Sequence, residues 1–389
     1  MDLSLIIDIE SGHVRAALAV LKLSKENEWI GTPRHILYSV SVPISRTPHT
    51  VHEHLLIEMG RSLSKAVETA FKEGLRKIPK GKITSIHYVL SSPWIVTKTR
   101  CVKVNYPKKT AVTKKTIEKI VEAERIELQN AFIPNDVAGM VYDLTCIEQK
   151  IFEIKLDGYP VVHLAATNAG KTKPSSKHIP KKASELEVSF AVTMSSVGIV
   201  NQVQAIVEKV VRVKDQAFHS ALLLLFASVR NVFDDAKDYI VAHVHGEVSD
   251  IILVNNNIYS LIASFPFGTS TFLRKSSQAT DESERLMQSM LALHTSSSLH
   301  GDHHEKVSKA IDPVIRSWST DLMSTISGAR AGKSPFPNTI FLFAKDYHSH
   351  FERALRDVAG SMKLDIVPFK YETLLDMYAL ALEQIQHHE

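Results

Sequence analysis

Cysteine and long apolar runs are both scarce in this sequence. Only two cysteines, Cys101 and Cys146, occur in 389 residues, which argues against a disulfide framework and for a reducing compartment. The longest apolar run, residues 221–227, is far shorter than the roughly 20 residues that a membrane-spanning helix needs. The first ten residues are acidic rather than signal-like. We therefore expect a cytoplasmic protein.

Strong charge and recognisable catalytic motifs are also missing. A net charge of +4 over this length is too small to predict nucleic-acid binding, which usually requires a dense basic face. No Gly-x-Ser-x-Gly elbow is present, and the "NAGKT" segment at residues 168–172 lacks the glycine spacing of a phosphate loop. We predict no catalytic residue.

Histidines gather in one polar stretch near residue 300. His294, His300, His303 and His304, together with Asp302 and Glu305, invite interpretation as a zinc site. The stretch is rich in serine and has no thiolate or helical i, i+4 histidine pair to fix tetrahedral geometry. We therefore expect a solvated loop and predict no metal ligand.

Two strand–turn–strand patterns occur in the chain. Residues 3–9 and 14–21 form the first pair and residues 240–244 and 249–254 the second, each joined by a short polar turn. Helical spacing of apolar residues covers 51–75 and the last segment, 371–385, in which Tyr371, Leu374, Leu375, Tyr378, Leu382 and Ile385 share one face. No lysine or arginine follows Lys370, so we expect a helix that packs on the core and not a membrane anchor.

A separate strand–helix–strand–strand unit lies between the two patterns. Its strands are residues 95–104, 150–159 and 186–195, and its helix begins near Thr113. A lysine-rich segment at 166–184 is expected to be a surface loop of undetermined role. The unit also carries a basic face that is either merely solvated or a site for an acidic partner: Lys98, Arg100, Lys103, Lys108, Lys109, Lys114 and Lys115.

The order of these elements resembles the FtsA and PilM family of actin-like proteins. "LIIDIESGHVRAAL" is similar to the family's first phosphate motif, "HVHGEVSDIILV" to its second and "SFPFGTSTFLRK" to the Pro-x-Gly segment that follows; "NTIFLFAKD" stands where the adenosine-side glycines would be. The strand–helix–strand–strand unit resembles the family's SHS2 insertion. The resemblance implies an α/β, actin-like (ribonuclease H-like) two-domain fold with an inserted SHS2-type subdomain.

The resemblance also implies domain boundaries. The first actin-like domain would comprise residues 1–96 and 199–237, interrupted by the insertion at 97–198. The second would comprise residues 238–365, and a closing helix would occupy 366–389.

Residues matching the family's nucleotide site are few, and others contradict it. The matching positions, which the resemblance assigns to cofactor binding, are Asp8, Ser11, Gly12, Gly246, Ser249, Asp250 and Gly268. Each also has a structural interpretation, as a strand-end cap, a turn glycine or a solvated hairpin residue. Glu10 replaces a glycine and His243 an aspartate, while Lys345 and Asp346 stand where adenine needs bare backbone. We therefore expect a former phosphate site with no favoured cofactor, ATP with Mg²⁺ remaining possible if the site still functions.

The resemblance leaves three functions open. The favoured one is a scaffold of type IV pilus assembly, held at the inner membrane by the cytoplasmic tail of a membrane-protein partner, with possible self-association. The alternative is an FtsA-like cell-division ATPase that binds ATP and polymerises at the membrane. A sugar kinase of the same superfamily is the least favoured, because no catalytic base stands beside a convincing phosphate loop.

Overall fold

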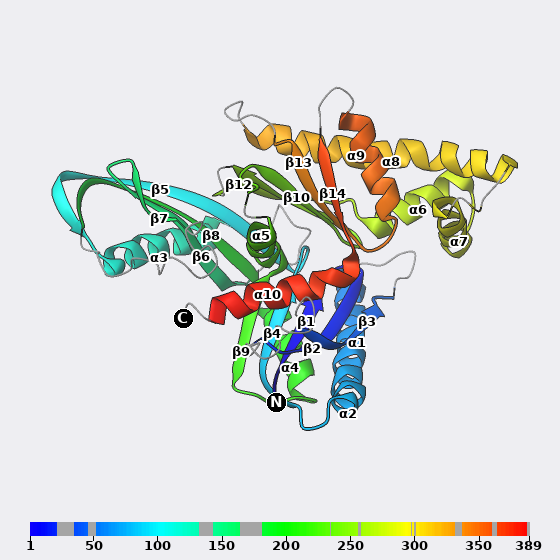
Figure 1. The fold of residues 1–389 in the computed structure, drawn as a ribbon, viewed down its shortest axis with the longest axis horizontal. Helices are drawn as coiled ribbons and strands as arrows, with labels where there is room; N and C mark the ends of the chain where they lie inside the picture. The colour runs from blue at the N-terminus through cyan, green and yellow to red at the C-terminus, as the bar shows by residue number, and fades with distance from the viewer. Residues whose placement is uncertain are drawn as a thin grey trace.

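The described strands form three sheets joined into an elongated molecule (Figure 1). The computed structural model describes residues 1–21, 35–45, 52–131, 143–163, 181–233, 235–255, 258–296, 298, 301–330, 337–359 and 364–386. We call the sheet nearest the N-terminus, with its helices, the first lobe; the sheet built from residues 239–369 is the core of the second lobe. The third sheet, built from residues 95–196, is the inserted sheet.

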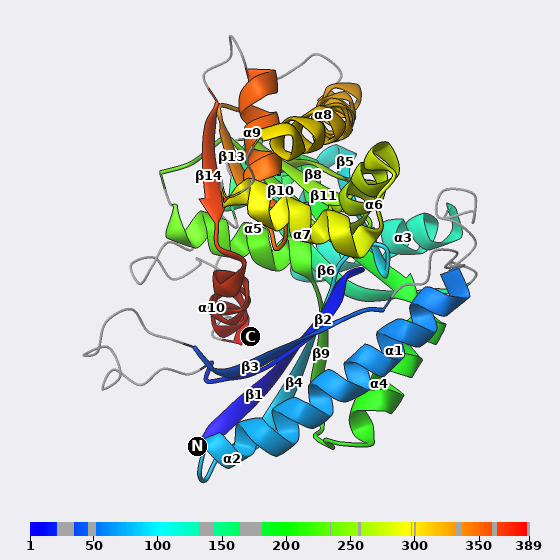
Figure 2. The same cartoon turned by 90° about the vertical axis from the view of Figure 1, so that its right-hand side faces the viewer.

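The first lobe is a mixed sheet with helices on both faces. Its strand order is β3-β2-β1-β4-β9, in which β1, β2 and β3 are antiparallel and β4 and β9 continue in parallel. The strands are β1 (Asp2–Ile9), β2 (His13–Ala19), β3 (Ile36–Pro43), β4 (Lys82–Leu90) and β9 (Asp215–Ser220). Helices α1 (His52–Thr69) and α4 (Val197–Glu208) lie side by side over one face (Figure 2). A π-helical turn, Ala70–Gly74, and the short α2, Leu75–Lys77, extend α1.

The second lobe repeats this strand pattern. Its order is β12-β11-β10-β13-β14, again an antiparallel hairpin followed by parallel strands. The strands are β10 (Tyr239–Val244), β11 (Ser249–Asn255), β12 (Ile258–Phe265), β13 (Thr339–Ala344) and β14 (Asp365–Phe369). One face packs against residues of α6 (Thr269–Thr280), α7 (Glu284–Thr295), α8 (Gly301–Arg330) and α9 (His348–Ala359).

Two helices join the lobes. The apolar α5 (Ala221–Val232) and the closing α10 (Leu374–Gln386) share a core with residues of both sheets, including Ile6 of β1 and Val241 of β10. The closing helix begins after a 3-10 turn, Tyr371–Thr373. Its predicted apolar face is buried except for Ile385, which is partly buried, as expected for a helix that packs on the core.

The inserted sheet is a four-stranded antiparallel sheet with one helix against it. Its order is β5-β8-β6-β7, with β5 (Ile95–Val112), β6 (Leu144–Leu156), β7 (Tyr159–His163) and β8 (Lys181–Ser196). Helix α3 (Lys114–Ala131) packs Ile117, Val121 and Leu128 against it. Helix α4 and strand β9 then return to the first lobe, so this sheet interrupts that lobe's sequence. On this basis we propose the five-part domain division given above.

The structure corrects four details of the sequence prediction. The sequence predicts one helix over residues 216–233, but residues 215–220 form strand β9 and helix α5 begins only at Ala221. The sequence predicts that residues 258–273 continue the sheet, but residues 269–273 begin helix α6. The inserted unit gains the short strand β7 after the turn at Asp157 and Gly158. The predicted polar loop at 294–306 is helical from residue 301 onward.

Across the described residues, no helix combines the length and the apolar character required to span a membrane. The lysine-rich segment at 166–184 falls outside the described residues up to residue 180, and its last residues, 181–184, lie in β8.

Candidate functional site

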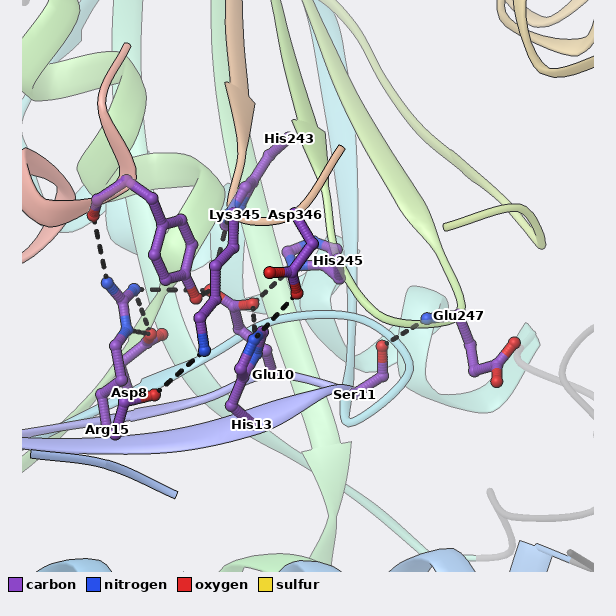
Figure 3. A network of polar contacts seen from close by, with 12 residues as sticks. Asp8, Glu10, Ser11, His13, Arg15, His243, His245, Glu247, Lys345 and Asp346 are labelled. Carbon is purple, nitrogen blue, oxygen red and sulfur yellow. Dashed lines mark hydrogen bonds and ion pairs between the residues drawn. The ribbon is translucent and has the colours of Figure 1, made fainter. Parts of the chain in front are cut away.

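The turns of the two predicted phosphate hairpins touch each other (Figure 3). The backbone N–H of Glu247, between β10 and β11, donates to Ser11 Oγ, between β1 and β2, at 2.9 Å. A Cβ placed on Gly12 would lie 3.1 Å from the Cα of Gly246. The two lobes therefore meet directly at the position where the resemblance places the phosphates.

A buried ion pair links the strands of the first hairpin. Asp8 and Arg15 face each other across β1 and β2, and Arg15 Nε donates to Asp8 Oδ2 at 2.8 Å. The guanidinium also lies over the ring of Tyr371, 4.1 Å from its centroid. Complete burial raises the pKa of Asp8 to about 6, although Arg15 opposes this rise. The buried charge of Arg15 is tolerated because its two neighbours, the Asp8 carboxylate and the Tyr371 ring, are buried with it and interact with it.

Glu10 occupies the centre of the site. Its side chain is 1% exposed, and its Oε1 accepts a hydrogen bond from the Tyr371 hydroxyl at 2.7 Å. Arg15 Nη2 lies 3.4 Å from the same oxygen, and the Trp94 indole donates to the Glu10 carbonyl at 3.1 Å. Burial alone would raise the pKa of Glu10, but the neighbouring histidines His13, His243 and His245 hold it well below its usual value.

Three histidines surround the Glu10 carboxylate. His13 Nδ1 and His245 Nδ1 lie 3.5 and 3.7 Å from Oε2, and His243 Nε2 lies 3.6 Å from Oε1. Burial, with His245 nearby, lowers the pKa of His243 to about 4. Burial would also lower the pKa of His245, but Asp250 and Glu10 overcome it and raise that pKa to about 10. The positive charge of His245 therefore lies between the negative charges of Glu10 and Asp250 in the protein interior.

Asp250 is fixed by three donors. Its Oδ2 is 2.8 Å from His245 Nε2 and 3.3 Å from the backbone N–H of Ser92, and its Oδ1 accepts from Ser264 Oγ at 2.6 Å. Burial would raise its pKa, but His245 and these hydrogen bonds lower it. The Asp250 carboxylate, which the resemblance assigns to cofactor binding, is thus committed to protein groups.

Ser249 and Gly268 serve the second lobe's own structure. Ser249 Oγ donates to the Phe267 carbonyl at 2.6 Å and accepts from the Trp318 indole at 2.9 Å. A Cβ on Gly268 would come within 2.4 Å of the His245 carbonyl oxygen, so only glycine fits beside this turn. Ser249 and Gly268 therefore support the β10–β11 hairpin through contacts within the second lobe.

Residues 338–346, the segment "NTIFLFAKD", also contribute side chains to the site. Lys345 Nζ lies 3.3 Å from Ser41 Oγ and 5.7 Å from the ring centroid of Tyr371, and burial lowers its pKa. Asp346 Oδ2 is 3.8 Å from His13 Nε2. Both residues stand where the resemblance places adenine, and both bridge to the first lobe.

The structure thus brings together Asp8, Ser11, Gly12, Gly246 and Asp250 of the predicted cofactor site. It joins them to residues that sequence reasoning did not select, above all Arg15, His13 and Tyr371. A triphosphate needs bare, concave backbone to approach, whereas these turns touch and buried side chains fill their surroundings. The residues present do not fit that group.

The predicted histidine cluster is only partly gathered. His294, at the end of α7, stacks on His304 of α8 with 4.7 Å between centroids, and its Nε2 is 2.9 Å from Ser308 Oγ. His300 and the side chains of residues 302 and 303 lie outside the described residues. Helical structure from residue 301 replaces the expected loop. His350 packs beside His294, and burial, then His294 and Arg353, lower the pKa of His350 to about 4.

A groove lies on the inserted sheet, between β5 and α3. Its volume is about 440 Å³, and its apolar lining includes Val104, Tyr106 and Ile120. Lys115 and Lys119, both exposed, belong to its wall. It lies on a different part of the molecule from the buried network.

No protein-family model matches the chain, and neither does any curated protein. Among solved structures, the chain is similar to a PilM-PilN type IV pilus biogenesis complex, with 13% identity, a TM-score of 0.57 and coverage of 99% of this chain and 98% of that one. It is also similar to the ethanolamine utilization protein EutJ from Carboxydothermus hydrogenoformans, with 8% identity, a TM-score of 0.45 and coverage of 98% and 89%. A Bacteroides thetaiotaomicron protein with an actin-like ATPase fold has 8% identity, a TM-score of 0.39 and coverage of 98% and 95%. The chain has the actin-like α/β fold that its sequence predicts.

Proposed function

We propose that this protein is an actin-like scaffold that binds the cytoplasmic segment of a membrane protein in type IV pilus assembly, as PilM-like proteins do. The observation that carries the proposal is the groove between β5 and α3. It is supported by the likeness over nearly the whole chain to a structure described as a PilM-PilN type IV pilus biogenesis complex. The inserted sheet then corresponds to an SHS2-type subdomain, and the protein sits at the inner membrane through its partner.

The groove suits an extended peptide. Strand β5 is at the edge of the inserted sheet in the described part of the chain, and a peptide can add to such an edge through backbone hydrogen bonds. Val104, Tyr106 and Ile120 offer apolar contacts for alternate side chains of that peptide. Because these side chains lie next to the β5 edge, one peptide can form backbone hydrogen bonds with β5 and apolar contacts in the groove at the same time.

Charge around the groove favours an acidic peptide. All seven basic residues named from the sequence are exposed, together with Lys119. Lys103 and Lys114 pair with Glu185 and Glu118, so part of this charge is compensated within the protein. Lys115 and Lys119 line the groove itself, and Lys108 and Lys109 are exposed on β5.

The test is binding of peptides that cover the cytoplasmic segments of the host's type IV pilus membrane proteins. We expect one peptide to bind with a micromolar Kd, measured by fluorescence anisotropy. Ile120→Asp should weaken it at least tenfold, because a buried apolar contact worth about 1.4 kcal/mol or more is lost. Lys72→Glu, on the first lobe, is the control and should bind normally. If no peptide binds, or if Ile120→Asp binds as well as the native protein, the proposal fails.

We further propose that the hairpin site does not bind ATP, because Glu10, Arg15 and three histidines fill it. Calorimetric titration with Mg-ATP should show no heat of binding at micromolar concentrations, and saturating nucleotide should not raise Tm. A ligand at a hundred times its Kd would add about 2.7 kcal/mol of stability. A micromolar Kd, or ATP-dependent filaments, would instead favour the FtsA-like ATPase.

A further inference from the structure

Three potential metal ligands from the two hairpins converge inside the protein. One ligand atom each of Glu10, His243 and His245 lies within 4.8 Å of the others, and all three residues are buried. We propose that they bind a divalent first-row transition metal, with Zn²⁺ the preferred ion, that connects the two lobes. This site does not depend on the proposed partner or on the groove.

The distances suit ligands of one ion better than hydrogen bonds. His243 Nε2 and His245 Nδ1 lie 3.6 and 3.7 Å from oxygens of Glu10. Hydrogen bonds between such atoms are normally about 2.7–3.2 Å long. Neighbouring ligands of a tetrahedral ion with bonds of about 2.0–2.1 Å are about 3.3 Å apart. All three ligand atoms lie within 4.8 Å of one another, so they must move closer together to complete the coordination.

Polar atoms without hydrogen-bond partners point to the same place. Among the described residues, the buried atoms lacking such a partner include Glu10 Oε2, His245 Nδ1 and both ring nitrogens of His243. Leaving each of these atoms unsatisfied in the interior costs about 1–3 kcal/mol. A shared cation would displace the proton from His245 Nδ1 and satisfy Glu10 Oε2, His245 Nδ1 and His243 Nε2 at once.

Outer hydrogen bonds hold two of the ligands in a binding orientation. His245 places Nε2 2.8 Å from Asp250 Oδ2, which leaves Nδ1 directed toward Glu10. Histidines that bind metals commonly donate their other ring N–H to a carboxylate in this way. Tyr371 similarly donates to Glu10 Oε1 at 2.7 Å.

The ligand set favours zinc. Two imidazoles and one carboxylate are borderline ligands that bind Zn²⁺, whereas Mg²⁺ prefers an all-oxygen shell. His13 Nδ1, buried and also without a hydrogen-bond partner, lies 3.5 Å from Glu10 Oε2 and is the candidate fourth ligand. Four protein ligands would make a closed structural site, and its ion would hold the β1–β2 and β10–β11 turns together.

Metal content of the untagged, full-length protein tests the site. After dialysis against metal-free buffer, mass spectrometry should find about one zinc ion per chain. Removal of the ion with a chelator should lower Tm, and stoichiometric Zn²⁺ should restore it by about 5 °C; Mg²⁺ should not. Co²⁺ added to the apoprotein should give the strong visible absorption of tetrahedral cobalt.

Matched variants locate the ion. His243→Gln and His245→Gln should each lose stoichiometric metal. His87→Gln should keep it, because His87 is a buried histidine whose ring pairs with His219 at 3.1 Å, away from the hairpins. His304→Gln, in the stacked pair of α7 and α8, should also keep it. If a ligand variant fails to fold, Co²⁺ absorption of the native apoprotein still shows whether a tetrahedral site exists, and the same absorption in His304→Gln excludes the stacked pair of α7 and α8.

Three results would overturn the proposal. One is substantially less than one ion per chain combined with no Tm response to excess Zn²⁺. Another is metal content in His243→Gln and His245→Gln equal to that of the native protein. The third is loss of metal in His304→Gln alone, which would assign the ion to the surface pair of histidines.

Discussion

Replacing Arg15 by methionine should destabilise the protein by about 4 kcal/mol. Methionine keeps much of the side chain's length and removes the charge that faces Asp8 and Glu10. At 2.8 Å and an effective dielectric constant of 20, the attraction between Arg15 and Asp8 alone is about 6 kcal/mol. Desolvation of the guanidinium offsets part of that attraction, and removal of one partner from a buried pair typically costs about 3–5 kcal/mol.

The assay is chemical unfolding at pH 7.5, followed by circular dichroism and tryptophan fluorescence. Trp94 is a suitable reporter because its indole donates to the Glu10 carbonyl and its side chain is 1% exposed. Arg61→Met is the control, since the Arg61 side chain is 72% exposed and pairs only on the surface with Glu58. It should cost less than about 1 kcal/mol.

A double variant separates the lost pair from the lost packing. Asp8→Asn combined with Arg15→Met removes both charges, so no lone buried carboxylate remains at position 8. The double variant should lose less stability than the sum of the single changes, with a coupling energy above about 1 kcal/mol. Our description of the network is wrong if Arg15→Met costs no more than Arg61→Met, or if the two changes are additive.

Three further predictions concern other parts of the structure. Gly268→Ala should cost about 3 kcal/mol, because its Cβ would clash with backbone oxygens at 2.4 and 2.5 Å, while Gly198→Ala, whose nearest neighbour is a side-chain oxygen at 3.5 Å, should be neutral or stabilising in denaturant titrations. Ser11→Ala should cost about 1 kcal/mol, since the partly buried N–H of Glu247 loses its acceptor; unchanged Tm would contradict the contact between lobes. Since burial lowers the pKa of His350 to about 4 from about 6.5, the unfolded state binds more protons between these values, and stability falls as pH falls through them. His350→Leu should therefore recover about 2 kcal/mol of the stability lost between pH 7.5 and pH 5, and an unchanged pH profile would refute this assignment.

Much of the fold was accessible from the sequence because alternation and helical spacing are local signals. The two hairpins, the order of elements and the apolar face of the closing helix follow from such patterns. Strand β9 was missed because residues 215–220 run directly into helix α5 without a glycine or proline to separate them. Strand β7 was missed because it continues a hairpin beyond the turn at Gly158.

The candidate site was only half accessible. The sequence identifies Glu10, His243 and Lys345 as side chains that interfere with phosphate or adenine. Their spacing in the sequence does not show that they belong to one network of contacts in the folded protein. Arg15 carried a usable signal, since a charged residue inside an apolar strand requires a buried partner. Tyr371 lies 361 positions from Glu10 in sequence, so only the fold brings its hydroxyl to that carboxylate.

The need of buried polar groups for partners also explains why the two hairpins remain polar. Actin-like lobes that clamp a nucleotide leave backbone donors and a carboxylate facing a ligand, and without the ligand those groups must find other partners. Here Arg15 of β2 and Tyr371, which lies between β14 and α10, provide partners for Asp8 and Glu10 from within the chain. These partners belong to the chain, so they do not leave the site as a nucleotide does. We therefore expect the relative position of the lobes to be independent of nucleotide, and binding of a partner to take place on the inserted sheet without a nucleotide-driven change in the lobes.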